Sequence, residues 1–582
     1  MKSFLKNILT TMIGIISSII VMILLIIGFV AIISSEDEVK VKENSILKID
    51  LANTSVVERS SENPFDGLSL SGDVASTIEL KQVLDNIEKA KFDNNIQVIY
   101  INTSYVSAGI SQIEEIRNKL LEFKQTGKPI IAYSEVYNQA AYYLSSVANK
   151  VYLNPEGIVE LKGLSAGIMF YKGLLEKLDI EVQIIRHGKF KSAVEPFMLD
   201  KMSDANREQM QLLLNSFADN LFDSIASQRG MSISDIHNHA NNLSLENAKS
   251  CLDLQYIDAL LYQDQVDDSL LVISKSEKLN FISLNKYSNV KVAKKEISRN
   301  KIAIIYATGE INSGEGDEKS IGSETTAKAI KTAREDKNVK AIVLRVNSPG
   351  GSALASDVIW RETVLAKEEK PLIVSMGDYA ASGGYYIACA ADSIVANPTT
   401  LTGSIGVFGM IPNLQKLYKN KLGISIDTVN TNKHADMGMN RALTKFEEDK
   451  IQKSVVDIYT TFITHVGEGR NMSTTAVDEI GQGRVWTGYD AKDIGLIDTY
   501  GGLEKAIEIA VYLAEIEDYR IISLPKKKDP FAELALKFGG ETSISDLVML
   551  KLGLKTELTN PIENLLKRDK IQARIPFIME LK

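Results

Sequence analysis

The feature that most constrains the fold is an internal repeat. Residues 139–155 and 382–398 align without a gap, and the window contains these identical pairs: Tyr142 and Tyr385, Tyr143 and Tyr386, Ala148 and Ala391, Asn154 and Asn397, Pro155 and Pro398. Further along, residues 229–231 correspond to 470–472, and 247–249 correspond to 490–492. Self-similarity over so long a period indicates a duplicated unit. The sequence therefore predicts two similar halves in tandem.

Within each half, short apolar runs alternate with stretches of helical periodicity. This alternation predicts βαβ units around a mainly parallel sheet, which is an α/β fold. In the first half we expect strands at 46–51, 96–102 and 129–133 and helices at 80–91 and 113–123. In the second half we expect strands at 302–307, 341–347 and 371–374 and helices at 326–333 and 355–366.

Residues 8–33 carry no charge. At about 1.5 Å per helical residue they can cross a bilayer of roughly 30 Å. Lys2 and Lys6 precede this run and acidic residues 36–38 follow it, so the positive-inside rule places the N-terminus in the cytoplasm and the remaining chain outside. Because the run is long and lacks a small-x-small cleavage site, we expect an uncleaved anchor crossing the inner (cytoplasmic) membrane once.

These patterns divide the chain into four regions. They are 1–35, the cytoplasmic N-terminus and membrane anchor; 45–295, the first half; 298–525, the second half; and 526–582, a tail that could pack on a neighbouring subunit or lie on a membrane surface. The net charge of −9 gives no reason to expect nucleic acid as a partner. With only two cysteines, no metal cluster is indicated, and we expect no cofactor.

Ser382 is the candidate nucleophile. It follows the apolar run 371–374 and precedes a helical segment rich in small residues, so it lies at a strand-to-helix turn. Gly383 and Gly384 let another backbone come close, and N–H groups at a helix start favour developing negative charge. A tight packing joint would have the same local sequence. In the first half Gln139 stands at this position and cannot act as a nucleophile.

A serine nucleophile needs a base to take its proton. Among the five histidines, His187 and His434 are best placed, but no carboxylate is singled out to accompany either. Lys191 is the candidate lysine, because it follows an apolar run and burial there would lower its pKa from about 10.4. Lys189 is a nearby competitor, and Lys433 aligns with Lys191 in the second half. A surface position is the alternative for each of these lysines.

Oxyanion donors are predicted in the Asn-Ser-Pro-Gly-Gly-Ser segment at 347–352, directly after the strand at 341–347. Consecutive glycines, here Gly350 and Gly351, can present backbone N–H groups to a tetrahedral oxyanion. An ordinary Pro-Gly turn is the alternative. The corresponding strand of the first half ends at Asn102 without a glycine pair, so only the second half carries both features.

Four motifs together resemble signal peptide peptidase A of the long, duplicated, membrane-anchored bacterial type. They are KFKSAVEP at 189–196, RVNSPGGS at 345–352, AASGGY at 380–385 and TGSIG at 402–406. The resemblance covers about residues 45–520 and implies a Ser/Lys-dyad serine protease on tandem ClpP/crotonase-like domains, assembled as a homotetramer. It also implies Ser382 as nucleophile, Lys191 as base, Gly350 or Gly351 in the oxyanion hole, and Ser404 as a hydroxyl that orients the lysine.

The sequence and the resemblance together predict a membrane-anchored serine endopeptidase whose substrates are peptides, with remnant signal peptides implied by the resemblance. Two other functions are alternatives. A crotonase-type enzyme acting on an acyl thioester would use similar glycine loops, but an anchor that faces outward, where coenzyme A is scarce, argues against it. A non-catalytic membrane scaffold is the second alternative.

Overall fold

The computed structural model describes residues 10–12, 14–15, 17–18, 21, 39–60, 76–290, 298–527 and 571–575. Most of the expected anchor at 8–33, and most of the tail from 526 onward, lie outside the described residues. Within the part that is described, no helix is both long enough and apolar enough to cross a bilayer.

The first half is built on a six-stranded sheet in the order β8-β6-β5-β4-β1-β9, with every neighbouring pair parallel. Its strands are β1 (Ser45–Ile49), β4 (Ile96–Ile101), β5 (Ile130–Tyr137), β6 (Lys150–Val159), β8 (Ala259–Leu260) and β9 (Phe281–Ser283). The apolar core on one face packs against α2 (Leu80–Phe92), α3 (Ile110–Lys124), α4 (Gln139–Ser145), α8 (Ile233–Asn241), α9 (Ala248–Asp253) and α11 (Leu284–Ser288). Helix α10 (Gln263–Ser274) covers the other face.

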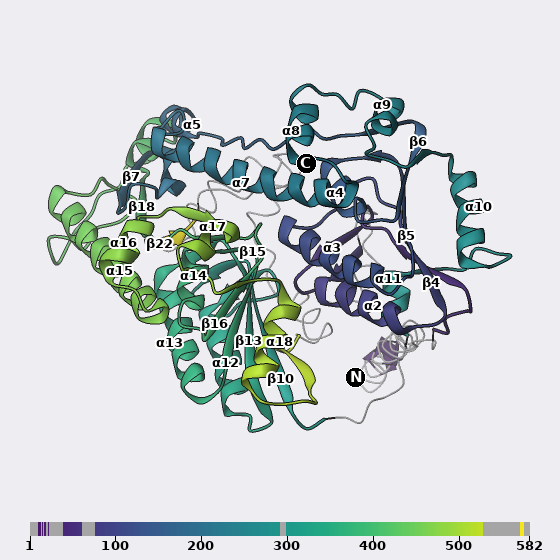
Figure 1. Cartoon of the computed structure of the whole chain (residues 1–582). Coiled ribbons are helices and arrows are strands. Elements are labelled where there is room, and N and C mark those ends of the chain that lie inside the picture. Colours follow the sequence, from purple (N-terminus) through teal and green to yellow (C-terminus); the bar gives the residue numbers. More distant parts are fainter. Residues whose placement is uncertain are drawn as a thin grey trace.

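The second half repeats this architecture on an eight-stranded sheet whose main path is β19-β17-β15-β13-β10-β21. Its strands are β10 (Lys301–Thr308), β13 (Val339–Ser348), β15 (Leu372–Ala381), β16 (Ser393–Ala396), β17 (Leu401–Gly403), β19 (Val485–Thr487), β20 (Thr499–Tyr500) and β21 (Arg520–Leu524). One face packs against α12 (Ser323–Glu335), α13 (Ala353–Glu369), α14 (Gly383–Ala388) and α15 (Lys445–Arg470), and α18 (Leu503–Leu513) lies on the other (Figure 1). Strands covered on both faces explain the nearly continuous apolar runs in the sequence.

The expected strands and helices are present in both halves, with ends that differ by a few residues. The largest difference is the strand expected at 371–374, which continues as β15 to Ala381. Its second part contains Ser375, Gly377 and Asp378, so the apolar pattern ends before the strand does. These residues stay in the sheet because β13 and β17 flank the strand and pair with it up to Ala381. The extension brings the strand directly to Ser382.

A third sheet joins the two halves, in the order β12-β11-β14-β22-β18-β7. Its strands are β7 (Glu181–Arg186), β11 (Glu310–Asn312), β12 (Ser320–Gly322), β14 (Gly350–Ser352), β18 (Phe408–Asn413) and β22 (Ile571–Arg574). Strand β7 comes from the first half but pairs antiparallel with β18 of the second. Helix α5 (Lys172–Lys177) lies beside β7, and α7 (Asp204–Arg229) then runs back across both halves (Figure 1).

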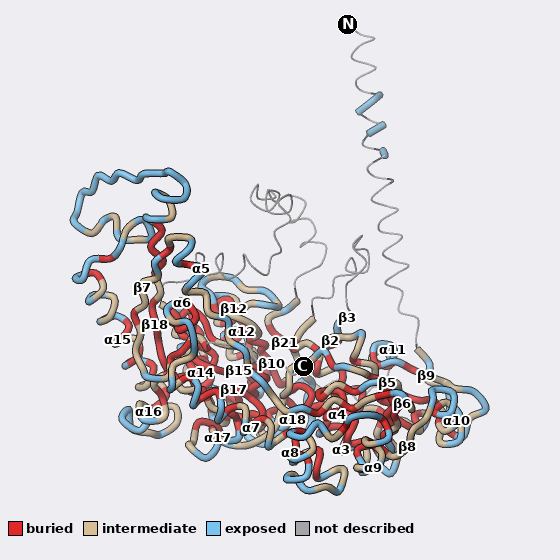
Figure 2. Tube along the Cα trace, turned by 90° about the horizontal axis from the view of Figure 1, so that it is seen from above, coloured by how far each residue is buried: buried red, intermediate tan, exposed pale blue. Residues whose placement is uncertain are grey.

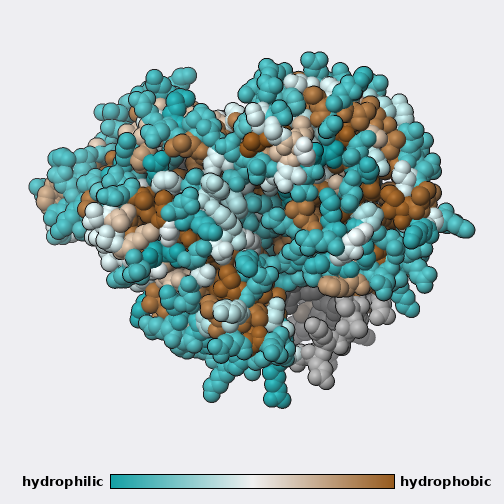
Figure 3. Space-filling view, viewed as in Figure 1, coloured by the Kyte–Doolittle hydropathy of each residue, from teal (hydrophilic) through white to brown (hydrophobic). Residues whose placement is uncertain are grey.

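Several smaller elements lie around these sheets. They are the parallel pair β2 (Thr54–Val57) and β3 (Ser76–Glu79), α6 (Glu195–Met198), α16 (Thr474–Ile480) and α17 (Gly488–Asp493). Residues 419–433, between β18 and α15, are all exposed and project from the body beside β7 and β18 (Figure 2). On the face shown in Figure 3, hydrophilic residues predominate and hydrophobic residues occur in several small groups.

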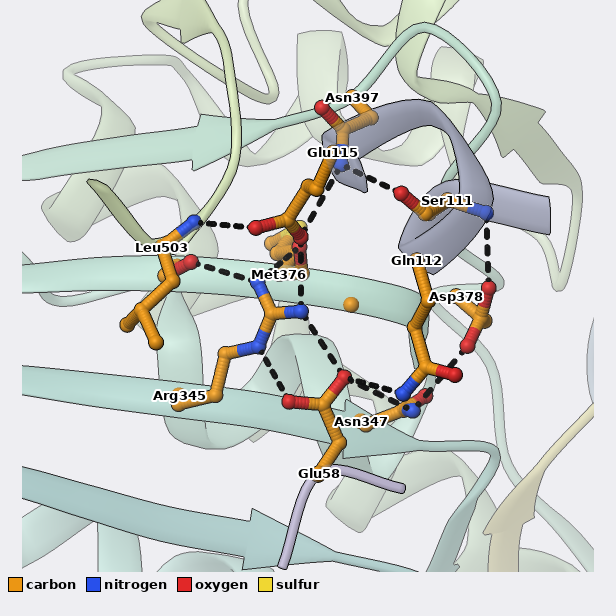
Figure 4. A network of polar contacts seen from close by, with 12 residues as sticks. Glu58, Ser111, Gln112, Glu115, Arg345, Asn347, Met376, Asp378, Asn397 and Leu503 are labelled. Carbon is orange, nitrogen blue, oxygen red and sulfur yellow. Dashed lines mark hydrogen bonds and ion pairs between the residues drawn. The ribbon is translucent and has the colours of Figure 1, made fainter. Parts of the chain in front are cut away.

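A buried polar network also holds the halves together (Figure 4). Arg345 on β13 donates to Glu58 Oε2 at 2.8 Å and to Glu115 Oε1 at 2.8 Å, and both carboxylates belong to the first half. The N-terminal turn of α3 meets β15, where Asp378 Oδ1 accepts from the Ser111 N–H at 2.9 Å. A carboxylate at a helix N-terminus satisfies an otherwise unpaired N–H group and suits the helix dipole. Because Asp378 and Arg345 lie on the strands that lead to Ser382 and Gly350, the network fixes those strands against the first half.

Candidate active site

Ser382 lies where β15 ends and α14 begins, and its backbone is strained. Its φ of 56° and ψ of −112° fall in a region that residues other than glycine rarely occupy. The Ser382 N–H donates to Gly403 O at 2.7 Å, which helps to hold the turn in place. Such strain at a strand-to-helix turn is found at nucleophilic serines, because it presents the side-chain oxygen at the edge of the sheet.

Lys191 reaches Ser382 from the first half. It follows β7, whose pairing with β18 carries this segment to the second half. Lys191 Nζ lies 2.8 Å from Ser382 Oγ, and both residues are 0% exposed. Burial lowers the pKa of Lys191 well below the ordinary value for lysine. A lysine in this position can therefore be neutral and accept a proton from the serine.

Ser404 completes the surroundings of the lysine amine. Lys191 Nζ lies 3.1 Å from Ser404 O and 3.1 Å from Ser404 Oγ. The position of Ser404 is fixed by its own N–H, which donates to Arg484 O at 2.7 Å. Gly483 packs directly against the backbone of Lys191, where a Cβ would come within 2.7 Å of Lys191 Cα. The amine thus has three oxygen neighbours within 3.1 Å in a fully buried position.

The predicted oxyanion glycines lie next to the nucleophile in β14. Gly350 has a φ of +100°, and a Cβ there would lie 2.9 Å from Gly383 N, so glycine is required for the close approach. The Gly350 N–H donates to Ser348 Oγ at 3.2 Å. Gly351 pairs with Ile311 of β11 on one side and with Ala573 of β22 on the other. The site thus brings together Ser382, Lys191, Ser404, Gly350 and Gly351, all five of the predicted residues.

The competing bases lie elsewhere. Lys189 and Lys433 are exposed. His434 Nδ1 lies 2.8 Å from Glu447 Oε1, and the ring of His187 packs against Tyr459 at 4.3 Å between centroids. All five histidines are among the described residues, and no hydrogen bond joins any of them to Ser382.

In the first half the corresponding turn has a structural role. Gln139 is the first residue of α4, directly after β5, just as Ser382 adjoins α14 after β15. Its side-chain Oε1 accepts from the N–H groups of Lys162 and Gly163 at 3.2 and 3.1 Å. The glutamine thereby holds the loop that follows β6 in place through these two hydrogen bonds.

Two neighbours of Ser382 and Lys191 were not predicted as site residues, although one of them, Gly406, ends the TGSIG motif. Gly406 O lies 3.3 Å from Ser382 Oγ, and a Cβ at Gly406 would lie 3.2 Å from Lys191 Cδ. Gly483 lies in the Gly-Gln-Gly segment 481–483, whose recurring glycines were the available signal for a close backbone approach. Both glycines confine the lysine stem.

Comparisons with known proteins identify the class. The sequence profile of peptidase family S49 matches residues 122–275 and again 365–517, which confirms the duplication. Protease 4 of Salmonella typhi is 38% identical over 78% of this chain and 74% of its own length. The chloroplastic serine protease SPPA of Arabidopsis thaliana is 36% identical over 87% of this chain and 75% of its own length. Among solved structures, ClpP1 from Listeria monocytogenes matches with a TM-score of 0.23 and 16% identity, over 34% of this chain and 91% of that one.

The chain belongs to peptidase family S49, and it is a serine protease. This outcome confirms the resemblance found in the motifs. It also decides against the thioester enzyme and the non-catalytic scaffold that the sequence left open.

Proposed function

We propose that Ser382 and Lys191 form the catalytic dyad of a membrane-anchored endopeptidase with a ClpP/crotonase-like fold in each half. The observation that carries the proposal is the 2.8 Å contact between Lys191 Nζ and Ser382 Oγ, in a place where both side chains are fully buried. A base must lie within hydrogen-bond reach of the proton that it takes.

Ser404 supports this assignment through the geometry of a neutral amine. A neutral lysine has two N–H bonds and one lone pair. Ser404 O and Oγ, each 3.1 Å from Lys191 Nζ, can accept hydrogen bonds from the two N–H groups of the neutral amine. The lone pair of the amine then faces the Ser382 hydroxyl. The lowered pKa of Lys191 increases the neutral fraction at a given pH.

In the proposed reaction Ser382 Oγ attacks the carbonyl carbon of the scissile peptide bond, and its proton passes to Lys191. The N–H groups of Gly351 and Gly383 face the oxyanion; Gly351 is preferred to Gly350, whose N–H already donates to Ser348 Oγ. Lys191 then protonates the leaving amine. Water next attacks the acyl ester while Lys191 accepts its proton, and the acid product leaves.

An active-site serine probe tests the proposal. A fluorophosphonate should label the wild-type protein at Ser382, and Ser382→Ala should lose both labelling and peptide hydrolysis. Ser454→Ala, at an exposed position of α15, should keep both. Labelling at a different serine, or normal turnover by the Ser382→Ala protein, would remove Ser382 from the mechanism.

The membrane anchor, the location and the assembly are further parts of the proposal. The uncharged run at 8–33 supports a single-pass anchor in the inner membrane with both halves outside the cytoplasm. Remnant signal peptides are the proposed substrates, and a homotetramer is the proposed assembly. Protease added to spheroplasts should digest both halves, whereas protection until lysis would contradict the topology. Sedimentation of the detergent-solubilised protein as a monomer would contradict the tetramer.

A further inference from the structure

The loop formed by residues 481–484 is the part of the second half against which Lys191 packs. It connects α16 to β19. Its Gly483 lies on the backbone of Lys191, and the Gly483 carbonyl accepts from Ser404 Oγ at 3.3 Å. The Arg484 carbonyl accepts from the Ser404 N–H at 2.7 Å. One loop therefore contacts both the backbone of the lysine and the serine that adjoins its amine.

Within this loop, Gln482 holds the two residues that precede Lys191. Its carbonyl accepts from the Phe190 N–H at 2.9 Å, and its side-chain Oε1 accepts from the Lys189 N–H at 3.4 Å. A Cβ built on Gly188 would lie 2.5 Å from Gln482 O, so the glycine permits this close approach. Because peptide groups are planar, holding two successive N–H groups fixes the direction in which the chain enters Lys191.

Gln482 is itself held by side chains of α15 and α16, the helices near β7 and β18 (Figure 1). Its N–H donates to Tyr459 Oη at 3.2 Å, and its Nε2 donates to Asp478 Oδ2 at 3.1 Å. The Tyr459 hydroxyl in turn donates to Asp478 Oδ1. Tyr459 is buried in the apolar core of the second half. Each polar group of Gln482 therefore has a partner, two in the lysine segment and two in the helices.

The backbone of Gln482 lies in the left-handed region, with a φ of 53°. Residues other than glycine seldom adopt this conformation, and it persists where the surrounding contacts determine it. Glycine would adopt the same backbone without strain, but it has no side chain that could bond Lys189 or Asp478. The contacts of the glutamine side chain therefore account for its presence at a position where the backbone alone would favour glycine.

We propose that Gln482 is a positioning residue for the reaction, and that it sets where the Lys191 amine lies relative to Ser382. Tyr459 and Asp478 support it from behind. The inference rests on the Ser382/Lys191 mechanism proposed above, because Gln482 acts through Lys191 and takes no part in proton transfer. The amine is at the end of a long side chain, so a displaced backbone moves it away from the hydroxyl. A displacement of about 1 Å in a catalytic group can lower the rate by about 100-fold.

The contacts of Gln482 also keep water away from the amine. Lys191 is fully buried, and this burial lowers its pKa. When residues 189 and 190 are no longer held, the lysine segment can separate from the loop, and water reaches the amine. The pKa of Lys191 then rises toward the ordinary value for lysine. Because only the neutral amine is a base, the ionisation that controls kcat/KM moves to higher pH.

The pH dependence of peptide hydrolysis by the purified full chain tests the proposal. Gln482→Gly keeps the backbone and its carbonyl but removes the side chain. Its kcat should fall by about 10- to 100-fold with little change in KM, and its kcat/KM midpoint should move to higher pH, where part of the activity returns. Gln255→Gly is the matched control and should behave like wild type, because Gln255 also has a positive φ, of 64°, but is exposed in the first half.

A second variant removes the support behind the glutamine. Tyr459→Phe keeps the buried ring and loses only the hydroxyl that contacts Gln482 and Asp478. The Gln482 side chain stays in this variant, so the kcat/KM midpoint should move in the same direction by a smaller amount.

The results that would overturn the proposal can be told apart from a failure of the dyad. A wild-type kcat and a wild-type pH midpoint in both variants would refute the positioning role, and the proposed function would stand as long as Lys191→Arg is inactive. Activity lost equally at every pH, together with a lowered Tm, would show that Gln482 only stabilises the fold. Normal turnover by Lys191→Arg would refute the dyad itself, and the role of Gln482 with it.

Discussion

Replacing Arg345 with methionine should destabilise the protein strongly. Arg345 is fully buried, and its guanidinium makes five hydrogen bonds, to Glu58, Glu115, Ser375 and the Met376 carbonyl. Methionine fills a similar volume but leaves the carboxylates of Glu58 and Glu115 buried without a cation. Removing one partner of a buried ion pair costs about 3–5 kcal/mol. At roughly 2–4 °C per kcal/mol, the Tm should fall by about 6–20 °C.

The assay uses the position of the tryptophans. Trp360 and Trp486 are the only two in the sequence, and both lie in the second half. Tryptophan fluorescence therefore follows the second half during urea unfolding, and far-ultraviolet circular dichroism follows both. Because Arg345 and its two carboxylates lie in different halves, the variant should give separate transitions with the two probes.

A control and a rescue sharpen this test. Arg361→Met, at an exposed position of α13, should change the unfolding free energy by less than about 0.5 kcal/mol. Adding Glu58→Leu and Glu115→Met to Arg345→Met should recover part of the lost stability, because no buried carboxylate then lacks a cation. Wild-type midpoints with both probes in the Arg345→Met protein would refute the reasoning that this network stabilises the contact between the halves.

Three further outcomes follow from the site and its surroundings. Lys191→Arg should be inactive in peptide hydrolysis, because a guanidinium cannot accept the serine proton. Lys433→Ala is the control and should keep substantial activity. Normal turnover by Lys191→Arg would show that Lys191 has a structural role. The kcat/KM should rise with pH along one ionisation well below that of free lysine, because only the neutral amine is a base, and a flat profile would contradict this. Burial raises the pKa of Asp378 to about 6, so the folded state keeps a proton that the unfolded chain loses near pH 4. The unfolding free energy should therefore fall by up to about 3 kcal/mol as pH rises from 4 to 6. Asp378→Asn should remove this contribution to the pH dependence of the unfolding free energy, measured by urea titration at each pH.

Much of the fold and the site could be predicted because the signals were local. The parallel strands are apolar on both faces and appear as runs in the sequence, and the repeat showed where the second half begins. Ser382 was recognisable from the small residues and glycines that a strand-to-helix turn requires. Lys191 and Lys189 differ by only two positions, but Lys191 is buried and Lys189 is exposed, as the apolar neighbours of Lys191 suggested.

The remaining features depend on contacts between distant segments. The pairing of β7 with β18 joins residues more than two hundred positions apart, and no local pattern specifies the partner of an isolated strand. The position of β22 could not be predicted for the same reason. Arg345 did carry a signal, because a charged residue inside an apolar strand requires a buried counter-charge, but the sequence alone does not say which carboxylates supply it.

In the proposed mechanism, the pairing of β7 with β18 also sets when activity can first arise during synthesis of the chain. A polypeptide is made from its N-terminus, so the segment with Lys191 leaves the ribosome long before β18 and Ser382 exist. Until then the lysine has neither the strand that positions it nor the hydroxyl it would deprotonate. In the proposed mechanism, a nascent chain interrupted anywhere before residue 382 lacks the nucleophile and is therefore inert.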